Sequence, residues 1–191
     1  SGLPANQRCF CIASLRLLQN IVAAPEPMGM HVKRQLDLSR WMKALVGMIS
    51  LDTHKPPELR VELFKTLSSI VDVSDADHVN ELLLLLDRIN LLDDVGMPAE
   101  LNKHEAQNQV FPVVRAYLEL MQALLSQRPY WNIVMSRPLD NRGGHSPLRL
   151  LNFVRDDVLA KHFSGRLYRE SGEKWQMALA SMSVLLELVQ Q

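Results

Sequence analysis

Six histidines and two cysteines are the side chains in this sequence best suited to hold a metal ion or to act in catalysis. No two histidines stand at the spacing of an HExxH helix or of another close ligand set. The histidines are His31, His54, His78, His104, His145 and His162. We interpret them as surface or packing residues, and the sequence predicts neither a metal site nor a cofactor.

The two cysteines, Cys9 and Cys11, are separated by one residue. On a helix this spacing points the side chains apart, which disfavours a shared disulfide or metal site. Free cysteine behaves as a small apolar residue, so both are expected in or near a core. Such sparse use of cysteine fits a reducing compartment.

An acidic group, Asp72, Asp75 and Asp77 beside His78, has the composition of a cation-binding segment. An EF-hand loop needs a glycine at its sixth position and a glutamate at its twelfth, and neither is present. Aspartate is also a favoured N-cap residue, so we expect Asp75 to cap a helix instead.

Motifs for phosphate binding and nucleophilic catalysis are missing from the sequence, which has no G-x-x-x-x-G-K-[ST] loop and no G-x-S-x-G turn. Asp156 and Asp157 are adjacent, so a helix would turn them about 100° apart, which is poor geometry for paired carboxylates. The single Arg142-Gly143-Gly144 unit is interpreted as a flexible turn. The sequence therefore predicts no catalytic residue, no enzyme activity and no small-molecule ligand, and an unrecognised active site is a third-ranked hypothesis.

The charge balance limits the possible partners. The chain has 191 residues, 47% of them hydrophobic, which is enough for a substantial core. Its 21 basic residues balance 21 acidic ones, and this neutrality argues against bulk electrostatic attraction to DNA or RNA. No apolar run reaches the roughly 18 residues that span a bilayer, although peripheral contact with a membrane stays open.

Apolar residues recur at spacings of three and four along most of the chain, which predicts about eight helices. No stretch alternates apolar and polar residues with β-branched enrichment, so the expected fold class is all-α. Proline and glycine mark the breaks between helices. The predicted helices span about residues 6–24, 38–51, 57–73, 76–89, 98–109, 112–125, 147–163 and 172–189.

A long connection, residues 126–146, is expected between the sixth and seventh of these helices, because two prolines and a Gly-Gly pair oppose regular structure there. The aromatic pair Tyr130-Trp131 is expected to pin it to the helices. Connections of this length usually have a role or are mobile.

The last two predicted helices carry clear apolar stripes, with Ser146 and Ser171 as their expected caps and Pro147 in the first turn of the earlier helix. A short connection joins them, so we expect them to lie antiparallel with these stripes buried. The first stripe is Leu148, Leu151, Val154, Val158 and Leu159, and the second is Trp175, Leu179, Met182, Leu185, Leu186 and Val189.

Helices of about 15 residues that recur every 20 or so residues are typical of stacked helical hairpins. We therefore predict that residues 1–191 form a single α-solenoid segment of antiparallel hairpins, similar to HEAT or armadillo repeats. A compact orthogonal bundle is the alternative.

An ordered series of residues in the second half of the chain, with a shorter piece near residue 62, supports a family resemblance. The series comprises Glu62–Lys65, Leu67, Glu100–Asn102, Glu105, Pro112, Arg115, Ala116, Leu120, Leu124, Leu151, Phe153–Asp156, Phe163, Arg166, Tyr168, Arg169 and Glu173–Trp175. In order and spacing it resembles the largest scaffold nucleoporins of the nuclear pore inner ring, which are karyopherin-like α-solenoids. The resemblance covers roughly residues 57–191, and it departs from the family where Val184 or Leu185 stands in place of an aromatic residue.

The resemblance implies that the chain is a middle segment of a much larger, curved α-solenoid. It implies a non-catalytic structural adaptor of the nuclear pore complex, located at the nuclear envelope, that binds the short helical motifs of linker nucleoporins and supports nucleocytoplasmic transport of protein and mRNA. It does not indicate which residues bind partners. The alternative is a HEAT-repeat transport receptor or another helical protein-binding module. Transport receptors are typically acidic, so the neutral charge disfavours that alternative.

Overall fold

The computed structural model describes residues 4–25, 35–50, 56–89, 91, 96–135, 147–163 and 168–190. Within these ranges all regular structure is helical and no strand occurs, as the sequence predicts. The elements are α1 (Ala5–Val22), α3 (Leu38–Ser50), α4 (Pro57–Val73), α5 (Ala76–Arg88), α6 (Gly96–Asn108), α7 (Pro112–Leu125), α8 (Arg128–Met135), α9 (Pro147–Asn152), η1 (Phe153–Ala160), α10 (Lys161–Phe163) and α11 (Ser171–Gln190).

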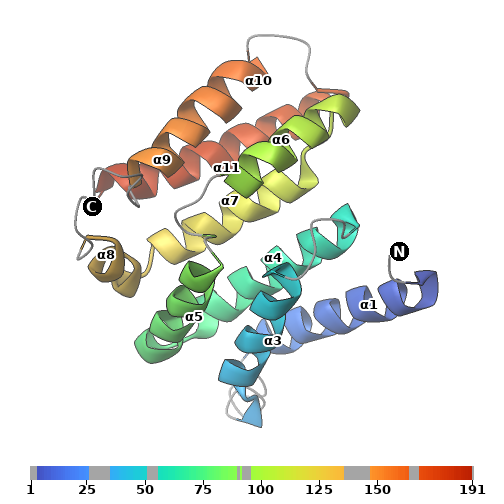
Figure 1. The fold of residues 1–191 in the computed structure, drawn as a ribbon, viewed down its shortest axis with the longest axis vertical. Coiled ribbons are helices and arrows are strands. Elements are labelled where there is room, and N and C mark those ends of the chain that lie inside the picture. Colours follow the sequence, from blue (N-terminus) through green and yellow to red (C-terminus); the bar gives the residue numbers. More distant parts are fainter. Residues whose placement is uncertain are drawn as a thin grey trace.

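Four helices form a row in which each packs on the next, in the order α1, α4, α7 and α11 (Figure 1). A second layer covers this row: α3 contacts α4 and α5, while α6 and the continuous segment α9–η1–α10 lie over α7 and α11. The segment α9–η1–α10 and α11 run in opposite directions, as predicted (Figure 1). This packing is consistent with a segment of a helical-repeat protein.

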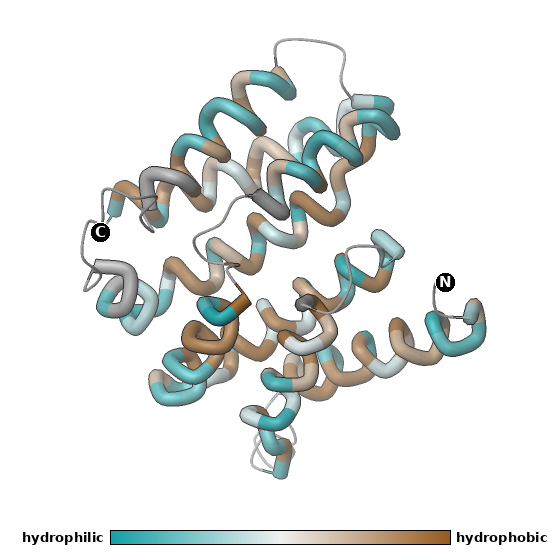
Figure 2. The backbone as a smooth tube through the Cα atoms, in the orientation of Figure 1, coloured by the Kyte–Doolittle hydropathy of each residue, from teal (hydrophilic) through white to brown (hydrophobic). Residues whose placement is uncertain are grey.

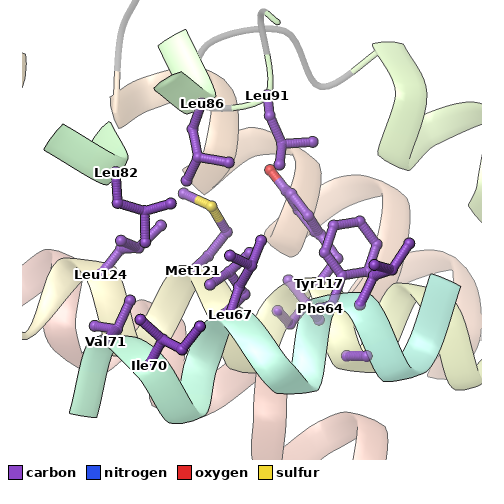
Figure 3. Close-up of a cluster of buried hydrophobic side chains, with 14 of the residues drawn as sticks. Phe64, Leu67, Ile70, Val71, Leu82, Leu86, Leu91, Tyr117, Met121 and Leu124 are labelled. Carbon is purple, nitrogen blue, oxygen red and sulfur yellow. The ribbon is translucent and has the colours of Figure 1, made fainter. Parts of the chain in front are cut away.

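The core of the row lies between α4 and α7, with α5 packed above it (Figure 3). Leu67 and Ile70 of α4 face Met121 and Leu124 of α7, and all four side chains are fully buried. The Phe64 ring of α4 meets the edge of the Tyr117 ring of α7, with 6.0 Å between the ring centroids. These helices are therefore fixed mainly by the burial of apolar surface.

The beginnings of several helices follow local rules visible in the sequence. The Asp75 carboxylate accepts the backbone N–H of His78 at 2.9 Å, which confirms the predicted cap of α5. Asp37 accepts the N–H of Arg40 at 3.0 Å in the same way at the start of α3. Pro57 and Pro112 occupy the first turns of α4 and α7, where a missing N–H costs nothing.

The predicted connection 126–146 is wrong in its first part, because residues Arg128–Met135 form helix α8. Pro129 is the second residue of this helix, a position that proline tolerates, so it does not oppose helical structure there. The Tyr130 side chain is buried, as expected of an anchor. Residues 136–146 lie outside the described residues, as do the predicted flexible turn at Arg142-Gly143-Gly144 and the expected cap Ser146.

The helix predicted over residues 147–163 is present, but its central part, η1, is a π-helix. Its i→i+5 bonding widens the turns relative to an α-helix, so the buried face differs from the predicted stripe. Val154 and Val158 are buried as predicted, whereas Phe153, also buried, was not part of that stripe.

None of the helices that the structure describes combines the length and apolar character needed to cross a bilayer.

Candidate functional site

A buried polar cluster lies where the connection between α6 and α7 meets α10 and the segment before α11. We call this cluster the hairpin junction and define it by Asn102, Glu105, Phe111, His162 and Tyr168. Helix α6 is largely hydrophilic in Figure 2, and two of its polar side chains, Asn102 and Glu105, are buried. The junction therefore adds polar contacts to the apolar ones, from Ala99, Leu101 and Ala106, that pack α6 on the core.

A chain of hydrogen bonds crosses the junction from η1 to Tyr168. The Asn102 Nδ2 donates to the backbone carbonyl of Asp157 at 3.1 Å, which ties α6 to the π-helix. The His162 Nε2 lies 2.8 Å from Asn102 Oδ1, and the His162 Nδ1 lies 2.6 Å from the Tyr168 hydroxyl. With Nε2–H as donor to the amide oxygen, Nδ1 accepts the Tyr168 O–H, and this assignment fits a neutral imidazole. Burial lowers the pKa of His162 to about 4, which keeps the ring neutral at neutral pH.

Glu105 caps the next helix in the chain from outside that helix. The N-cap residue of α7, Phe111, has no side chain able to accept a hydrogen bond, and Pro112 follows it. The carboxylate of Glu105 accepts the backbone N–H of Val113 at 2.9 Å and that of Val114 at 3.0 Å. A helix N-terminus favours an anion, so these contacts satisfy α7 and bind it to α6. Burial raises the pKa of Glu105 to about 7, against the two backbone hydrogen bonds, which lower it.

Ring packing and one backbone bond complete the junction. The Phe111 ring lies 4.2 Å from the His162 ring and 5.1 Å from the Tyr168 ring, between centroids. The backbone N–H of Arg169 donates to the carbonyl of Gln109 at 3.3 Å. Gln109 has a φ of 59°, so the chain reverses between α6 and α7 through the left-handed region without a glycine.

The chemistry available at the junction is structural. A cavity of about 260 Å³ adjoins it, lined partly by Asn102, Asp157, Lys161 and His162. Both ring nitrogens of His162 are already hydrogen-bonded, and Asp157 pairs with Lys161 along the helix. These hydrogen bonds tie α6 and η1 to α10 and to the segment before α11, so the junction holds these helices together.

The structure assigns a role to several residues that the sequence singled out. Asn102, Glu105 and Tyr168 belong to the series that carries the family resemblance, and the fold brings them together. His162 is a packing histidine, as interpreted, but its hydrogen-bonding role was not predicted. The sequence held one signal for this role. Helix α6 has few apolar residues to bury, so its polar residues must help to hold it in place.

The other candidate metal ligands are distributed as follows. Of the acidic group, Asp75 caps α5, and its Oδ1 also lies 2.7 Å from His78 Nδ1. Among the described residues no group of three or more potential ligands could hold a metal ion. Cys11 is half-buried, but Cys9 is exposed, which corrects its expected place near a core. His31, His54 and His145 lie outside the described residues.

Helix α11 presents a second candidate site, and here the sequence prediction was wrong. Most of the stripe that was expected to be buried is exposed, with exposed fractions of 67% for Trp175, 71% for Leu179 and 78% for Val189. The buried face consists instead of Met177, Ala180, Ser181 and Val184. Because α11 is apolar on several sides, its small residues can face α7 at close approach and leave the large ones outside. We call the exposed set Trp175, Leu179, Met182, Leu186 and Val189 the α11 stripe.

A groove of about 400 Å³ runs beside this stripe, between α7 and α11. Its α7 wall carries Arg115 and Glu119, whose charged groups lie 3.7 Å apart, and Arg115 also donates to the Gln176 side chain. Its α11 wall includes Leu179, so the groove joins a polar wall to an apolar ridge. Such a surface suits a protein contact better than a small polar ligand.

The row of mutually buried helices, the structural junction and the exposed ridge define a segment of a helical-repeat protein. The chain is 25% identical over 196 residues to the nuclear pore complex protein Nup205 of Homo sapiens. The alignment covers 98% of this chain and 9% of the relative, so the chain is a distant homologue of a segment of that protein. This confirms the resemblance to a large nucleoporin and extends it to the first part of the chain. No protein-family model matches the chain, and no solved structure matches it significantly.

Proposed function

We propose that this chain is a scaffold segment of a nuclear pore complex, acting in the inner ring as part of a large adaptor nucleoporin. The observation that carries the proposal is the similarity to Nup205, which extends over nearly the whole chain. The proposed role is non-catalytic, because the relative that the chain resembles is a structural nucleoporin.

The fold suits a scaffold for a physical reason. A scaffold must keep its shape under load from its neighbours, and the row α1–α4–α7–α11 resists bending through a continuous apolar core. The hairpin junction adds directional bonds that fix how α6, α7 and α10 meet. Other nucleoporins, through the short helical motifs of linker proteins, are the proposed partners.

The proposed location is the nuclear pore complex at the nuclear envelope, where the chain would support transport of protein and mRNA without binding nucleic acid. We propose no direct nucleic-acid contact because the formal net charge is zero. The same neutrality sets it apart from a transport receptor, which is the alternative function.

Photobleaching separates these two functions in the living cell. The full-length protein is tagged with a fluorescent protein at its own chromosomal locus and bleached at the nuclear rim. A scaffold component stays bound, so the rim signal should recover far more slowly than that of a transport receptor measured in the same cells. Recovery as fast as the receptor, or the absence of a rim signal, would overturn the proposal.

A binding experiment then examines the partners. The full-length protein is immobilised and offered helical peptides of linker nucleoporins or nuclear transport cargo, with and without a Ran-type GTPase loaded with GTP. We expect peptide binding that is insensitive to the GTPase. Cargo binding that the GTPase releases would instead establish a receptor.

A further inference from the structure

A cavity of about 260 Å³ lies beside the hairpin junction, between α6 and the segment η1–α10. Helix α6 lines it with Ala99, Asn102, Lys103 and Ala106, which follow one another at helical spacing and therefore share one face. Alanine stands at both ends of this face, and its single methyl group leaves the space between the helices unfilled. We call this cavity the α6–η1 pocket.

The opposite wall of the α6–η1 pocket belongs to the π-helix and to the turn that follows it. Asp157 comes from η1, and Lys161 and His162 come from α10. π-Helical turns are rare in proteins, and they occur frequently at functional sites. A cavity that a π-helix lines is therefore a candidate binding site.

The charged groups of the pocket leave an excess of one positive charge. Lys103 and Lys161 line the pocket and are exposed, which places them at its mouth. Lys161 pairs with Asp157 along the helix, whereas no ion pair of Lys103 occurs in the part of the chain that the structure describes. His162 adds no charge at neutral pH, because burial lowers its pKa to about 4. A single anionic group would balance the excess.

Charge and shape together indicate which anion fits. A phosphate group carries about 1.5 to 2 negative charges, more than the pocket can balance, whereas a carboxylate carries one. The polar groups of Asn102 and His162 bind each other, and Asn102 also donates to the backbone carbonyl of Asp157. The α6 wall also presents the methyl groups of Ala99 and Ala106, which suit an aliphatic stem. The pocket therefore fits a carboxylate on a short aliphatic chain.

We propose that the α6–η1 pocket binds a glutamate side chain of a partner protein, with its carboxylate on the two lysines and its methylene groups against the two alanines. Pockets that enclose a small molecule usually measure about 300–1,000 Å³, so this one suits a single side chain whose main chain stays outside. The bound side chain would touch both α6 and the segment η1–α10, which adds a link across the hairpin junction. The proposal does not depend on the nuclear pore role.

Saturation-transfer NMR on the purified full-length protein tests the site, because this method detects weak ligands of large proteins. The probe is N-acetyl-glutamate N-methylamide, and its glutamine counterpart is the matched neutral probe. We expect the glutamate probe to bind, with its side-chain methylene protons receiving more saturation than its acetyl methyl group. The glutamine probe should bind about fivefold more weakly, since it lacks the charge.

Two variants and their controls locate the binding. Lys103→Gln should weaken binding of the glutamate probe about fivefold, whereas Lys43→Gln, at a lysine of α3 that pairs with Glu81, should not. Ala106→Leu should abolish binding by filling the pocket, and Ala44→Leu, at an exposed alanine of α3, should leave it unchanged. Lys103→Gln changes only an exposed side chain, so it reports on the site even if Ala106→Leu fails to fold.

Four outcomes overturn the proposal. Equal binding of the two probes, or unchanged binding in Lys103→Gln, would show that the pocket does not recognise a carboxylate. Tighter binding of inorganic phosphate than of the glutamate probe would indicate a phosphate site instead. Tighter binding of butyrate than of the glutamate probe would indicate a site for free small acids rather than for a protein side chain.

Discussion

The interface between α4 and α7 and the hairpin junction hold neighbouring helices by opposite means. In the first, Leu67, Ile70, Met121 and Leu124 exclude water without a directional bond (Figure 3). In the second, the Asn102 amide, the His162 imidazole and the Tyr168 hydroxyl form a hydrogen-bonded chain beside the Phe111 ring, and the Glu105 carboxylate binds the backbone of α7 separately.

The difference teaches which property each contact supplies. Apolar burial stabilises strongly but tolerates small shifts, because many packings of similar volume have similar free energy. A buried hydrogen-bond network adds less net stability but penalises every wrong geometry, since an unpaired buried group is costly. The row α1–α4–α7–α11 therefore supplies stability, and the junction supplies the angle between hairpins.

The largest effect should come from the apolar interface. Leu67→Ala removes a fully buried side chain between α4 and α7 and should lower the free energy of unfolding by about 2–5 kcal/mol. Urea denaturation followed by circular dichroism measures this. Leu84→Ala, at an exposed leucine of α5, is the matched control and should cost less than about 1 kcal/mol. Similar losses for the two variants would contradict the burial of Leu67.

The pH dependence of stability should report on the two titrating groups of the junction, His162 and Glu105. Burial lowers the pKa of His162 from 6.5 to about 4, so between these values the unfolded state binds more protons and stability falls as the pH is lowered. The pKa of Glu105 is raised from 4.5 to about 7, so its contribution has the opposite sign and is lost as the pH rises through that window. The two effects oppose each other between pH 4.5 and 6.5.

Glu105→Gln separates them, because it removes one titrating group. In this variant the free energy of unfolding should rise with pH by up to about 3 kcal/mol across the His162 window. Urea denaturation at half-unit pH steps measures the slope. A flat profile in Glu105→Gln would mean that His162 titrates with an ordinary pKa.

Removing the Asn102 amide should lower the free energy of unfolding by less than truncating the buried Leu67 but by more than truncating a surface residue. Asn102→Ala leaves the His162 Nε2–H and the Asp157 carbonyl without their partner and should cost about 2 kcal/mol. Asn108→Ala, at an exposed asparagine on the same helix, is the control and should be nearly neutral. An equal loss of stability in both variants would show that the hydrogen bonds of Asn102 do not stabilise the junction.

The smallest effect is expected at Trp175, although truncating so large a side chain would be costly if it were buried. Its ring is 67% exposed, so Trp175→Ala should lower the stability of the 191-residue chain by less than about 1 kcal/mol. Met177→Ala, two residues away on the buried face of α11, should cost about 2–5 kcal/mol. A cost at Trp175 equal to that at Met177 would place the ring in the interior.

Local rules made much of the fold predictable from the sequence. The stripes of α4 and α7, the caps at Asp37 and Asp75 and the start of α7 at Pro112 depend on residues a few positions apart. Periodicity therefore located most helices within a few residues.

The parts that were missed depend on neighbours distant in the sequence. Which face of α11 is buried is decided by α7, and periodicity cannot choose when a helix is apolar on several sides. The contact between Asn102 and His162 joins residues 60 positions apart, and no local pattern announces it. The π-helix and the helical start at Pro129 likewise required the packed structure.

The π-helix determines where this segment tolerates a change in chain length. Each of its i→i+5 bonds spans one residue more than the i→i+4 bonds of an α-helix. Deleting one residue from η1 would therefore allow α-helical bonding to resume with His162 still beside Asn102. A deletion between Asn102 and Glu105 in α6, where the bonding is already α-helical, would instead turn these two side chains about 100° relative to each other.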